Sequence, residues 1–516
     1  MTPNKKLIKK IKSYKLLILI LIFALILRII FFTGLNWSDD PEYVSDAYRV
    51  TKGDFFLGAY LPGLRKMMIY PIALFFWLFG VSNLSATSYT LICSLSEIIL
   101  IYYFGKTFFD VKTGILAAFF LSIFPLDIVY ASWPMPDVPL AFFSALSIFL
   151  FLKSKSFDGK KFYKIEVKKL ILFFSGITVG VAYLIKESGL IPLLFIIPYI
   201  LYETFKKRKI DFDYSFLFIG FLLIFLIEGL FYYYKTGDFL LRYHVVSDFY
   251  RVGRAGMNTN LMYYPLLMFN LSNNFSFILE NLYFVPYGLF YYFIFFSILY
   301  SLLKKVRKIF FIVFWFLIFF IYLEFGSMSF KQYIPIHKLD RHLIVLQTPG
   351  LLILSFSLID ILKNFRKSSR LKKFTKLGFV IFTICFLFFT SIYYASNIHA
   401  YLDASTWDMK EIYNFLKDYP NKKIYTDIGT ISHLRFYFHF QNDENLKNLA
   451  YVKNSTEMKE SFVVVYGSRG AVENTLSVDN IPDFVYKSLN EWKLVKVISG
   501  PKIDIFGTYD PKIYYV

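Results

Sequence analysis

Residues 37–60 read WSDDPEYVSDAYRVTKGDFFLGAY and follow the first strongly apolar run of the chain. The stretch carries five acids, which are Asp39, Asp40, Glu42, Asp46 and Asp54. The chain is 56% hydrophobic and only 18% charged, so an acidic cluster beside an apolar run needs a physical reason. Acidic side chains next to a bilayer cost free energy unless they face water, a partner or a metal. We therefore take this stretch as the candidate functional site, with a solvated loop as the alternative.

The composition of the rest of the chain is that of a polytopic membrane protein. The 516 residues include 63 Phe and 41 Tyr, which a soluble domain could not bury. The two cysteines, Cys93 and Cys385, fall inside apolar runs, which excludes a disulfide framework and a cysteine metal site. The formal net charge is +20, but most lysines lie between apolar runs, where they set topology. We therefore expect no nucleic-acid partner.

Eleven apolar runs are long enough, or nearly so, to cross a hydrocarbon core about 30 Å thick. They lie near residues 14–33, 87–104, 113–131, 137–153, 169–185, 188–204, 214–234, 279–302, 308–326, 341–362 and 375–394. Basic clusters occupy every second connection, starting with the lysines of residues 5–12. Because cytoplasmic loops carry the excess of Lys and Arg, the pattern predicts a cytoplasmic amino terminus and an extracytoplasmic carboxyl-terminal region. The predicted fold is a polytopic α-helical protein of the cell membrane, with about 11 transmembrane helices.

The apolar run at residues 67–80 is short for a span and contains Pro71. We interpret it as a helix that lies in the outer interface of the membrane. If it crossed, the later basic clusters would lie outside, against the positive-inside rule. The first outer connection then extends over residues 33–86 and includes the acidic stretch.

Other charged residues gather in the same outward set of connections, among them Asp137, Lys186, Arg242 and His244. A secondary transporter would instead place ionisable residues near the middle of the membrane, often in two related halves. The chain has no recognisable internal repeat, and Glu97 is the one clear mid-span charge in this interpretation. The pattern favours chemistry at one membrane face.

Residues 396–516 have shorter apolar runs and more Asn, Asp, Lys and Gly, which predicts a small soluble α/β domain. Residues 405–416 read as an amphipathic helix that starts with a capping box. The expected buried strands are residues 423–427, 462–467 and 493–498. We find no catalytic constellation in this domain, and we favour packing over metal ligation for His433 and His439.

An acidic loop with cations in neighbouring outer loops suits the transfer of a sugar from a lipid phosphate. Attack at the anomeric carbon needs a carboxylate that takes the proton from the acceptor hydroxyl. The leaving phosphate is a weak base, so it needs positive charge or a metal and no second acid. A transporter or flippase for a polyprenyl-linked glycan is the alternative from another class. A surface scaffold built around the tail domain is a third interpretation.

The stretch DDPEYVSDAYRVTKGDF resembles the first outer-loop signature of the GT-C membrane glycosyltransferases, in particular the ArnT-like and protein O-mannosyltransferase-like group of the family 39/83 type. The pattern consists of an acidic pair, a Tyr and a Gly-Asp, here Asp39, Asp40, Tyr43, Gly53 and Asp54. Four later segments also resemble this group and occur in the same order. They are IYPIALFFWLFGVS, PDVPLAFFSALSIFLFL with Asp137, GVAYLIKESG with Lys186, and LDRHLIVLQTPGLLIL with Arg341. The resemblance covers roughly residues 14–395.

The resemblance implies a GT-C transmembrane catalytic domain at residues 1–395 that takes its sugar from dolichyl or undecaprenyl phosphate and often uses a divalent metal ion. A lipid, glycan or protein would accept the sugar at the outer membrane face. The implied catalytic residues are Asp39, as the base or the acid that orients the acceptor, and Asp40 and Asp137, which would assist at the acceptor or the metal. Asp39 and Asp137 are the implied metal ligands. The implied phosphate-binding residues are Lys186 and Arg341, with Arg65 and Lys66 nearby. Glu42, Tyr43 and His244 are the candidates for acceptor or sugar contacts, and packing is the favoured alternative for His244.

The chain departs from this family at several positions. Many ArnT-like members have Arg three residues after the first acid, where this chain has Glu42, and His342 stands where Tyr is usual. The usual Lys-Pro-Pro ahead of the interfacial helix is absent. For this reason the transfer of aminoarabinose to lipid A is not carried over. Asp39 could also cap the helix that follows it, and Lys186 could extend to the headgroups.

Overall fold

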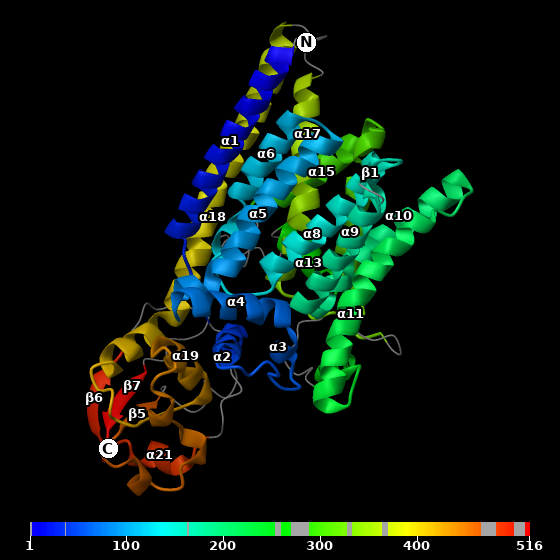
Figure 1. Cartoon of the computed structure of the whole chain (residues 1–516). Helices are drawn as coiled ribbons and strands as arrows, with labels where there is room; N and C mark the ends of the chain where they lie inside the picture. The colour runs from blue at the N-terminus through cyan, green and yellow to red at the C-terminus, as the bar shows by residue number, and fades with distance from the viewer. Residues whose placement is uncertain are drawn as a thin grey trace. The chain divides into compact units, whose positions relative to one another are not determined.

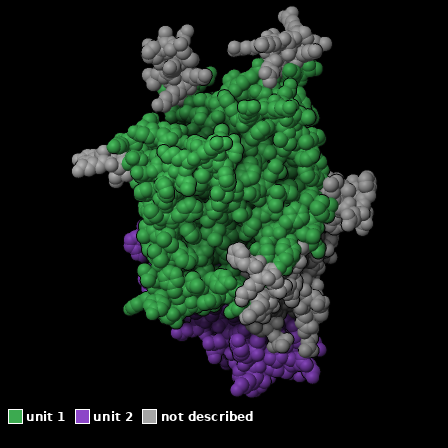
Figure 2. All heavy atoms as spheres, turned by 90° about the vertical axis from the view of Figure 1, so that its right-hand side faces the viewer, with its two compact units in different colours: residues 1–32, 58–68, 89–398 green, residues 33–57, 69–88, 399–516 purple. Residues whose placement is uncertain are grey.

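The computed structural model describes residues 3–36, 38–162, 165–252, 260–269, 288–327, 333–363, 370–465, 481–499 and 511–516. The chain forms two compact units, coloured separately in Figure 2, and each is described by itself. Unit 1 comprises residues 1–32, 58–68 and 89–398, and unit 2 comprises residues 33–57, 69–88 and 399–516. Three helices contribute residues to both units, namely α4 (Lys66–Phe79), α5 (Asn83–Phe108) and α18 (Arg370–Leu416).

Unit 1 is almost entirely helical. Its remaining helices are α1 (Pro3–Ile30), α3 (Leu61–Leu64), α6 (Val111–Ser122), α7 (Pro125–Tyr130), α8 (Asp137–Ser154), α9 (Val167–Ile185), α10 (Ile191–Lys207), α11 (Ser215–Thr236), α12 (Leu241–Val252), α13 (Tyr263–Met268), α15 (Phe290–Leu303), α16 (Phe310–Phe325) and α17 (Gln347–Lys363). A short hairpin, β1 (Lys161–Phe162) and β2 (Ile165–Glu166), precedes α9. Within the described residues, nine helices are long and apolar enough to cross a membrane. The chain is therefore a multi-pass membrane protein.

The main helix contacts of unit 1 can be followed in Figure 1. Helix α9 packs against both α8 and α11, and α6 contacts both α1 and α17. The contact between α9 and α11 is close because each helix contributes a glycine. A Cβ atom on Gly176 would lie 1.8 Å from Leu217 O, and one on Gly220 would lie 2.1 Å from Phe173 O. Such small residues let membrane helices approach at backbone distance.

The expected spans are confirmed in kind, but several boundaries were wrong. The run at residues 113–131 is divided into α6 and α7, because Pro125 starts a new helix and cannot continue the old one. Only residues 290–303 of the run near 279–302 form a described helix, α15, and residues 279–287 lie outside the described part. The helix expected at residues 67–80 is confirmed as α4, which contains Pro71, while its interfacial orientation stays a prediction.

The helix expected at residues 405–416 does not begin at Ser405. It is the end of α18, which runs without a break for 47 residues from Arg370 to Leu416. Ser405 therefore lies inside a helix, where its hydroxyl donates to Leu402 O at 2.7 Å and to Asn36 Oδ1 at 3.0 Å. The capping-box assignment was wrong because the spacing of two polar residues does not show whether a helix begins there.

Unit 2 contains a five-stranded sheet in the order β4-β3-β5-β7-β6. The strands are β3 (Ile424–Thr426), β4 (Leu446–Asn448), β5 (Phe462–Val465), β6 (Lys493–Val497) and β7 (Lys512–Tyr515). Strand β3 is parallel to β4 and β5, and β7 is antiparallel to β5 and β6. The tail is thus an α/β domain, as the sequence predicts. Strand β6 is largely exposed at the edge of the sheet, so its predicted burial was wrong.

The helices of unit 2 cover this sheet and carry the acidic stretch. Met409, Ile412 and Leu416 of α18 pack with Ile424 and other core residues on one face of the sheet. Helix α19 (Ile428–Tyr437) lies on the same face, and α21 (Asp483–Ser488) contributes Val485 to a second cluster. Helix α2 (Asp40–Thr51), formed by the acidic stretch, packs against α19.

Candidate functional site

Unit 1 brings three cations and two carboxylates together at helix ends, and we call this group the cation cluster. Its members are Arg65, Asp137, Lys186, Glu187 and Arg341. They come from segments far apart in the sequence, because α8 packs against both α9 and the 3-10 segment Asp340–Leu346. The structure therefore joins four residues that the sequence assigned to acid or phosphate roles, together with one that it did not assign.

Asp137 is the centre of the cation cluster. Its Oδ1 atom accepts a hydrogen bond from Lys186 Nζ at 2.7 Å, and its Oδ2 atom lies 3.3 Å from Arg341 Nε. The Asp137 side chain is 3% exposed, against 11% for Lys186 and 15% for Arg341. The carboxylate is thus buried behind two cations that retain some access to solvent. Arg341 also lies over the Trp133 ring, 5.9 Å from its centroid.

The chain turns sharply at Lys186, where α9 ends. Lys186 has an extended backbone, φ −155° and ψ 152°, and its amide donates to Ala182 O at 3.1 Å. Gly189 donates back to Lys186 O at 2.9 Å. A Cβ atom on Gly189 would lie 2.0 Å from Ala182 O, so the turn requires glycine. The KESG sequence is therefore a turn that projects a lysine from a helix end.

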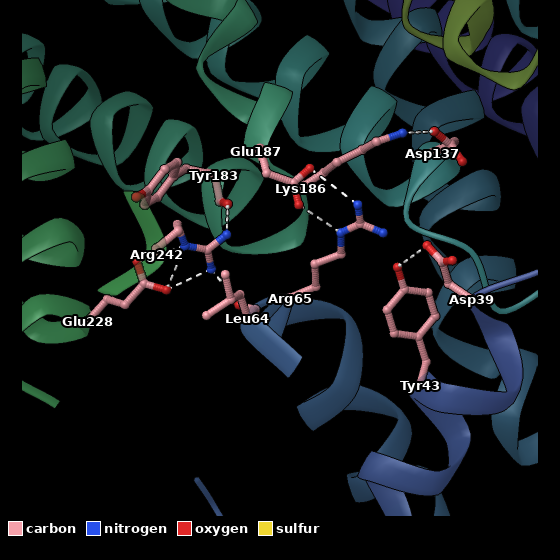
Figure 3. A network of polar contacts seen from close by, with 10 residues as sticks. All are labelled: Asp39, Tyr43, Leu64, Arg65, Asp137, Tyr183, Lys186, Glu187, Glu228 and Arg242. Carbon is pink, nitrogen blue, oxygen red and sulfur yellow. Dashed lines mark hydrogen bonds and ion pairs between the residues drawn. The ribbon is translucent and has the colours of Figure 1, made fainter. Parts of the chain in front are cut away.

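Arg65 forms the second ion pair of the cluster, and Figure 3 shows it directed at Glu187. Arg65 Nε lies 3.0 Å from Glu187 Oε1, and Arg65 Nη2 lies 3.3 Å from Oε2. Such a two-point contact fixes the plane of a guanidinium. Lys66, the neighbouring candidate, is buried with its ammonium over the rings of Phe231 and Tyr232.

Arg242 lies in a predicted outer loop and had no predicted role. In the structure it supports the backbone at Arg65. Its guanidinium pairs with Glu228 at 2.6 Å and donates to Tyr183 O at 3.2 Å and to Leu64 O (Figure 3). The side chain is 4% exposed. It therefore links the last turn of α9 to the residue before Arg65. Charge alone was the signal in the sequence, since a contact 178 residues away leaves no local pattern.

The electrostatics of the cluster favour an anionic ligand. Three cationic side chains share two carboxylates, so one positive charge is in excess among these five groups. Burial lowers the pKa of the Lys186 ammonium; Asp137 acts in the opposite direction, and Arg65 and Arg341 reinforce the effect of burial. Burial also lowers the pKa of His337, as do Arg341 and Lys186. A phosphate would add the negative charge that these groups favour.

The acidic stretch forms α2 in unit 2, and its acids have different surroundings. Asp39 occupies the N-cap position, yet its side chain makes no capping hydrogen bond, so the capping alternative is wrong. Its Oδ2 atom instead lies 3.4 Å from the hydroxyl of the buried Tyr43 (Figure 3). Asp40 is fully buried and accepts a hydrogen bond from Asn36 N at 2.5 Å. Glu42 is exposed.

The Gly-Asp pair of the signature closes the end of α2. Gly53 has φ +90°, a conformation that side chains rarely adopt. This turn brings Asp54 Oδ2 to 2.6 Å from Arg49 Nη2, and Arg49 also lies 3.0 Å from Asp46 Oδ1. These three residues thus fix the loop after the helix. His244 in α12 is 55% exposed and contacts Asp238 at 2.7 Å.

The described residues do not fit the divalent metal that the resemblance implies. Among them, no group of three or more His, Cys, Asp or Glu could hold a metal ion. At Asp137, the carboxylate oxygens already face Lys186 and Arg341, and a dication there would add to the positive excess. We therefore derive no catalytic step through a metal.

A second buried set of polar groups in unit 1, which we call the core network, lies within the apolar helices. Its members are Arg28, Ser94, Glu97, Asp127, Gln347 and Thr348. Arg28 donates to Asp127 at 2.5 Å, and Gln347 Nε2 donates to Asp127 at 2.8 Å and to Glu97 at 2.9 Å. Glu97 is therefore not the one mid-span charge. Arg28 and Asp127 leave little signal in the sequence, because each lies in a run that is otherwise mostly apolar.

Comparisons with known proteins give consistent results. The model of the dolichyl-phosphate-mannose-protein mannosyltransferase family matches residues 66–233. An uncharacterized protein of Aquifex aeolicus is 23% identical over 378 residues, which are 71% of this chain and 67% of that protein.

Three solved structures extend the likeness over most of the chain. ArnT from Cupriavidus metallidurans bound to undecaprenyl phosphate is similar with a TM-score of 0.57 and 12% identity, covering 96% of this chain and 97% of that one. The oligosaccharyltransferase AglB from Archaeoglobus fulgidus, in complex with an inhibitory peptide and a dolichol-phosphate, gives 0.56 and 13%, covering 84% and 64%. An oligosaccharyltransferase of that organism in complex with Zn and sulfate also gives 0.56 and 13%, covering 97% and 73%. The resemblance is confirmed, and the chain has the fold of the ArnT-like and protein mannosyltransferase-like GT-C membrane glycosyltransferases.

Proposed function

We propose that this protein transfers a sugar from a polyprenyl phosphate, dolichyl or undecaprenyl phosphate, to an acceptor at the extracytoplasmic membrane face. The observation that carries the proposal is the cation cluster, in which Arg65, Lys186 and Arg341 share two carboxylates and have one positive charge in excess. The GT-C fold and the match to the mannosyltransferase family support it further. The acceptor is a lipid, a glycan or a protein with a free hydroxyl.

In this proposal the cation cluster binds the phosphate of the donor. In the described residues Lys186 Nζ donates to one acceptor, Asp137 Oδ1, and an ammonium has three N–H donors. Two donors are then available for phosphate oxygens. Arg341 and Arg65 add guanidinium groups, which match phosphate geometry well. Asp137 and Glu187 keep the cations in place while the site is empty.

Asp39 is the proposed general base. Its carboxylate takes the proton of the acceptor hydroxyl while the acceptor oxygen bonds to the anomeric carbon. The bond from that carbon to the phosphate oxygen breaks, and the phosphate leaves with the electron pair. The cations stabilise the charge that develops on it. Asp39 is half-buried and makes no capping hydrogen bond to its own helix, and its Oδ2 atom lies 3.4 Å from the Tyr43 hydroxyl.

The Asp39→Asn variant tests the role of the base. General-base catalysis contributes roughly 10²- to 10⁴-fold, so transfer from a radiolabelled polyprenyl-phosphate sugar should fall by at least about 100-fold. Binding of the donor should stay close to that of the unmodified protein, because Asn keeps the shape of the side chain. Asp403→Asn is the matched control, since Asp403 is an exposed carboxylate of the same unit that pairs with Lys410.

Transfer by the Asp39→Asn variant at close to the original rate would refute the assignment. The alternative, a transporter or flippase, predicts that proteoliposomes move the labelled lipid across the bilayer without forming a glycosylated product. The scaffold alternative predicts that removing the tail domain abolishes function while substitutions of Asp39 and Lys186 have no effect.

A further inference from the structure

We infer that the carboxyl-terminal domain is a positioning device for the acidic helix α2, and that it acts through Asn36 and His433. The inference rests on the proposed role of Asp39, because it concerns how that carboxylate is oriented. All of the residues involved belong to unit 2. The tail domain, for which the sequence offered no catalytic residues, thereby acquires a role in the reaction.

Asn36 is a hub of hydrogen bonds three residues before Asp39. Its backbone N–H donates to Asp40 Oδ2 at 2.5 Å, and its side-chain Nδ2 donates to Leu402 O at 3.0 Å. Its Oδ1 accepts from Ser405 Oγ at 3.0 Å, and its backbone carbonyl faces His433 Nε2 at 3.0 Å. Asn36 is 3% exposed. Both polar groups of its backbone and both of its side chain are therefore engaged, three of them by the tail domain.

His433 reaches this hub from α19. The ring is 1% exposed, with Nδ1 3.0 Å from Gly429 O and Nε2 3.0 Å from Asn36 O. A neutral imidazole carries one N–H, so it donates to one of these carbonyls at a time. With the proton on Nε2, it donates to Asn36 O and ties the start of α2 to α19. This contact crosses 397 residues of sequence.

A second contact fixes α2 farther along its length. Tyr48 stacks on Phe440, with ring centroids 4.4 Å apart and planes 13° apart. Tyr48 and Asn36 are twelve positions apart, so the tail domain contacts the acidic segment at two separated points. Two separated contacts determine the rotation of a helix as well as its position. Nearby, His439 Nδ1 lies 2.8 Å from Val81 O, which attaches the segment before α5 to the same domain.

These contacts determine where the Asp39 carboxylate points. In the sequence Asp39 lies between Asn36 and Asp40, and the Asn36 N–H donates to the Asp40 carboxylate, which fixes these two residues relative to each other. Its carbonyl accepts the first helical bond of α2 from Tyr43 N at 3.1 Å. The carboxylate thus depends on this backbone for its direction. A displacement of 1 Å at a reacting group can cost about 10²-fold in rate.

The test compares His433→Leu, His433→Gln and Ser405→Ala with the unmodified full-length protein. His433→Leu removes the donor to Asn36 O, so kcat should fall by about 10-fold or more while KM for the polyprenyl-phosphate donor stays unchanged. His433→Gln offers an amide N–H and should recover part of kcat. Hydrogen exchange of the α2 amides should be faster in His433→Leu and intermediate in His433→Gln.

Ser432→Ala serves as the matched control, because Ser432 lies next to His433 on α19 but is only half-buried and bonds within its own helix. Should His433→Leu fail to fold, Ser405→Ala gives the same test in a milder form, since it removes one bond to the Asn36 side chain. For that variant we expect a reduction of kcat by a few fold at constant KM.

The inference is overturned if kcat and α2 exchange in these variants match the Ser432→Ala control while Asp39→Asn abolishes transfer. The proposed function would then stand without it. If Asp39→Asn also transfers sugar normally, the proposed function itself fails. Faster α2 exchange at an unchanged kcat would likewise overturn the inference, because it would separate the position of the helix from catalysis.

Discussion

Unit 1 contains two buried sets of charged side chains that differ in their exposure and in their ratio of cations to carboxylates. In the core network, the side chains of Arg28 and Asp127 are both 0% exposed, and Arg28 also donates to Ser94, Ala24 O and Ser122 O. In the cation cluster, Lys186 and Arg341 are 11% and 15% exposed. The core network has one cation for two carboxylates, and the cation cluster has three for two.

The difference separates a structural network from a candidate binding site. Both oxygens of Asp127 and of Glu97 accept hydrogen bonds from neighbouring groups, so the core network requires no ligand. The five groups of the cation cluster have one positive charge in excess, which an anion would balance. Lys186 and Arg341 also retain some access to solvent, through which an anion could approach. Buried ionisable residues in membrane helices are functional candidates by default, but here hydrogen-bond satisfaction, the sign of the excess charge and exposure distinguish the two sets.

The largest effect is expected from Arg28→Met, which breaks the core network. Loss of one partner of a buried ion pair leaves the other charge uncompensated and typically costs about 3–5 kcal/mol. We expect the free energy of unfolding in detergent to fall by about this amount. The double variant Arg28→Met/Asp127→Leu should recover most of the loss, because no buried charge is then unpaired. Equal stabilities for the single variant and the unmodified protein would remove the structural side of the comparison.

A smaller effect, on activity instead of folding, is expected from Lys186→Gln. Hydrogen bonds to charged groups contribute about 1.5–3 kcal/mol, so kcat/KM for the polyprenyl-phosphate donor should fall by about 10- to 100-fold. Asp137 still contacts Arg341 in this variant, so the free energy of unfolding should change little. Lys168→Gln is the matched control, because Lys168 pairs with Asp211 at the opposite end of the same helix. If both variants lose transfer equally, the cluster has no special role.

The smallest effect concerns pH and distinguishes lysine from arginine within the cluster. An ordinary lysine has a pKa of about 10.4, and burial lowers that of Lys186. As pH rises, Lys186 therefore loses its charge before an ordinary lysine does, and kcat/KM for the donor should begin to fall at a lower alkaline pH. Lys186→Arg keeps the charge and should remove this alkaline decrease. Its persistence in the arginine variant would assign it to another group.

Hydrophobic patterns predicted where helices and buried strands lie. They did not predict where one helix continues unbroken into the next expected element. Residues 423–427 and 462–467 were recognised because short runs of β-branched and aromatic residues are typical of buried strands. The unbroken α18 was missed, because tertiary contacts of Ser405 and Leu402 with Asn36 override the local capping signal. Residues 493–497 form the edge of the sheet, and their exposure depends on strand order.

The sequence indicated which residues could belong to the candidate site, but it did not indicate which of them form pairs. Asp137, Lys186 and Arg341 could be singled out because they resemble family motifs, but their contacts join positions 49 and 204 residues apart. Glu187 lies inside the GVAYLIKESG segment without an assigned role, and Arg242 belongs to none of the quoted segments. Their importance comes from burial and from the backbone carbonyls that Arg242 contacts, and neither can be read from a single sequence.

Asn36 also begins the sequence Asn36-Trp37-Ser38, which has the pattern of an acceptor for asparagine-linked glycans. A glycan would be attached to the side-chain nitrogen of Asn36, which in the folded unit donates to Leu402 O. Asn36 itself is only 3% exposed. An attached saccharide would displace Leu402 and Ser405 from this asparagine, so modification and the native arrangement exclude each other. In any cell that glycosylates asparagine, the native arrangement therefore requires that the tail folds onto this loop before Asn36 is modified.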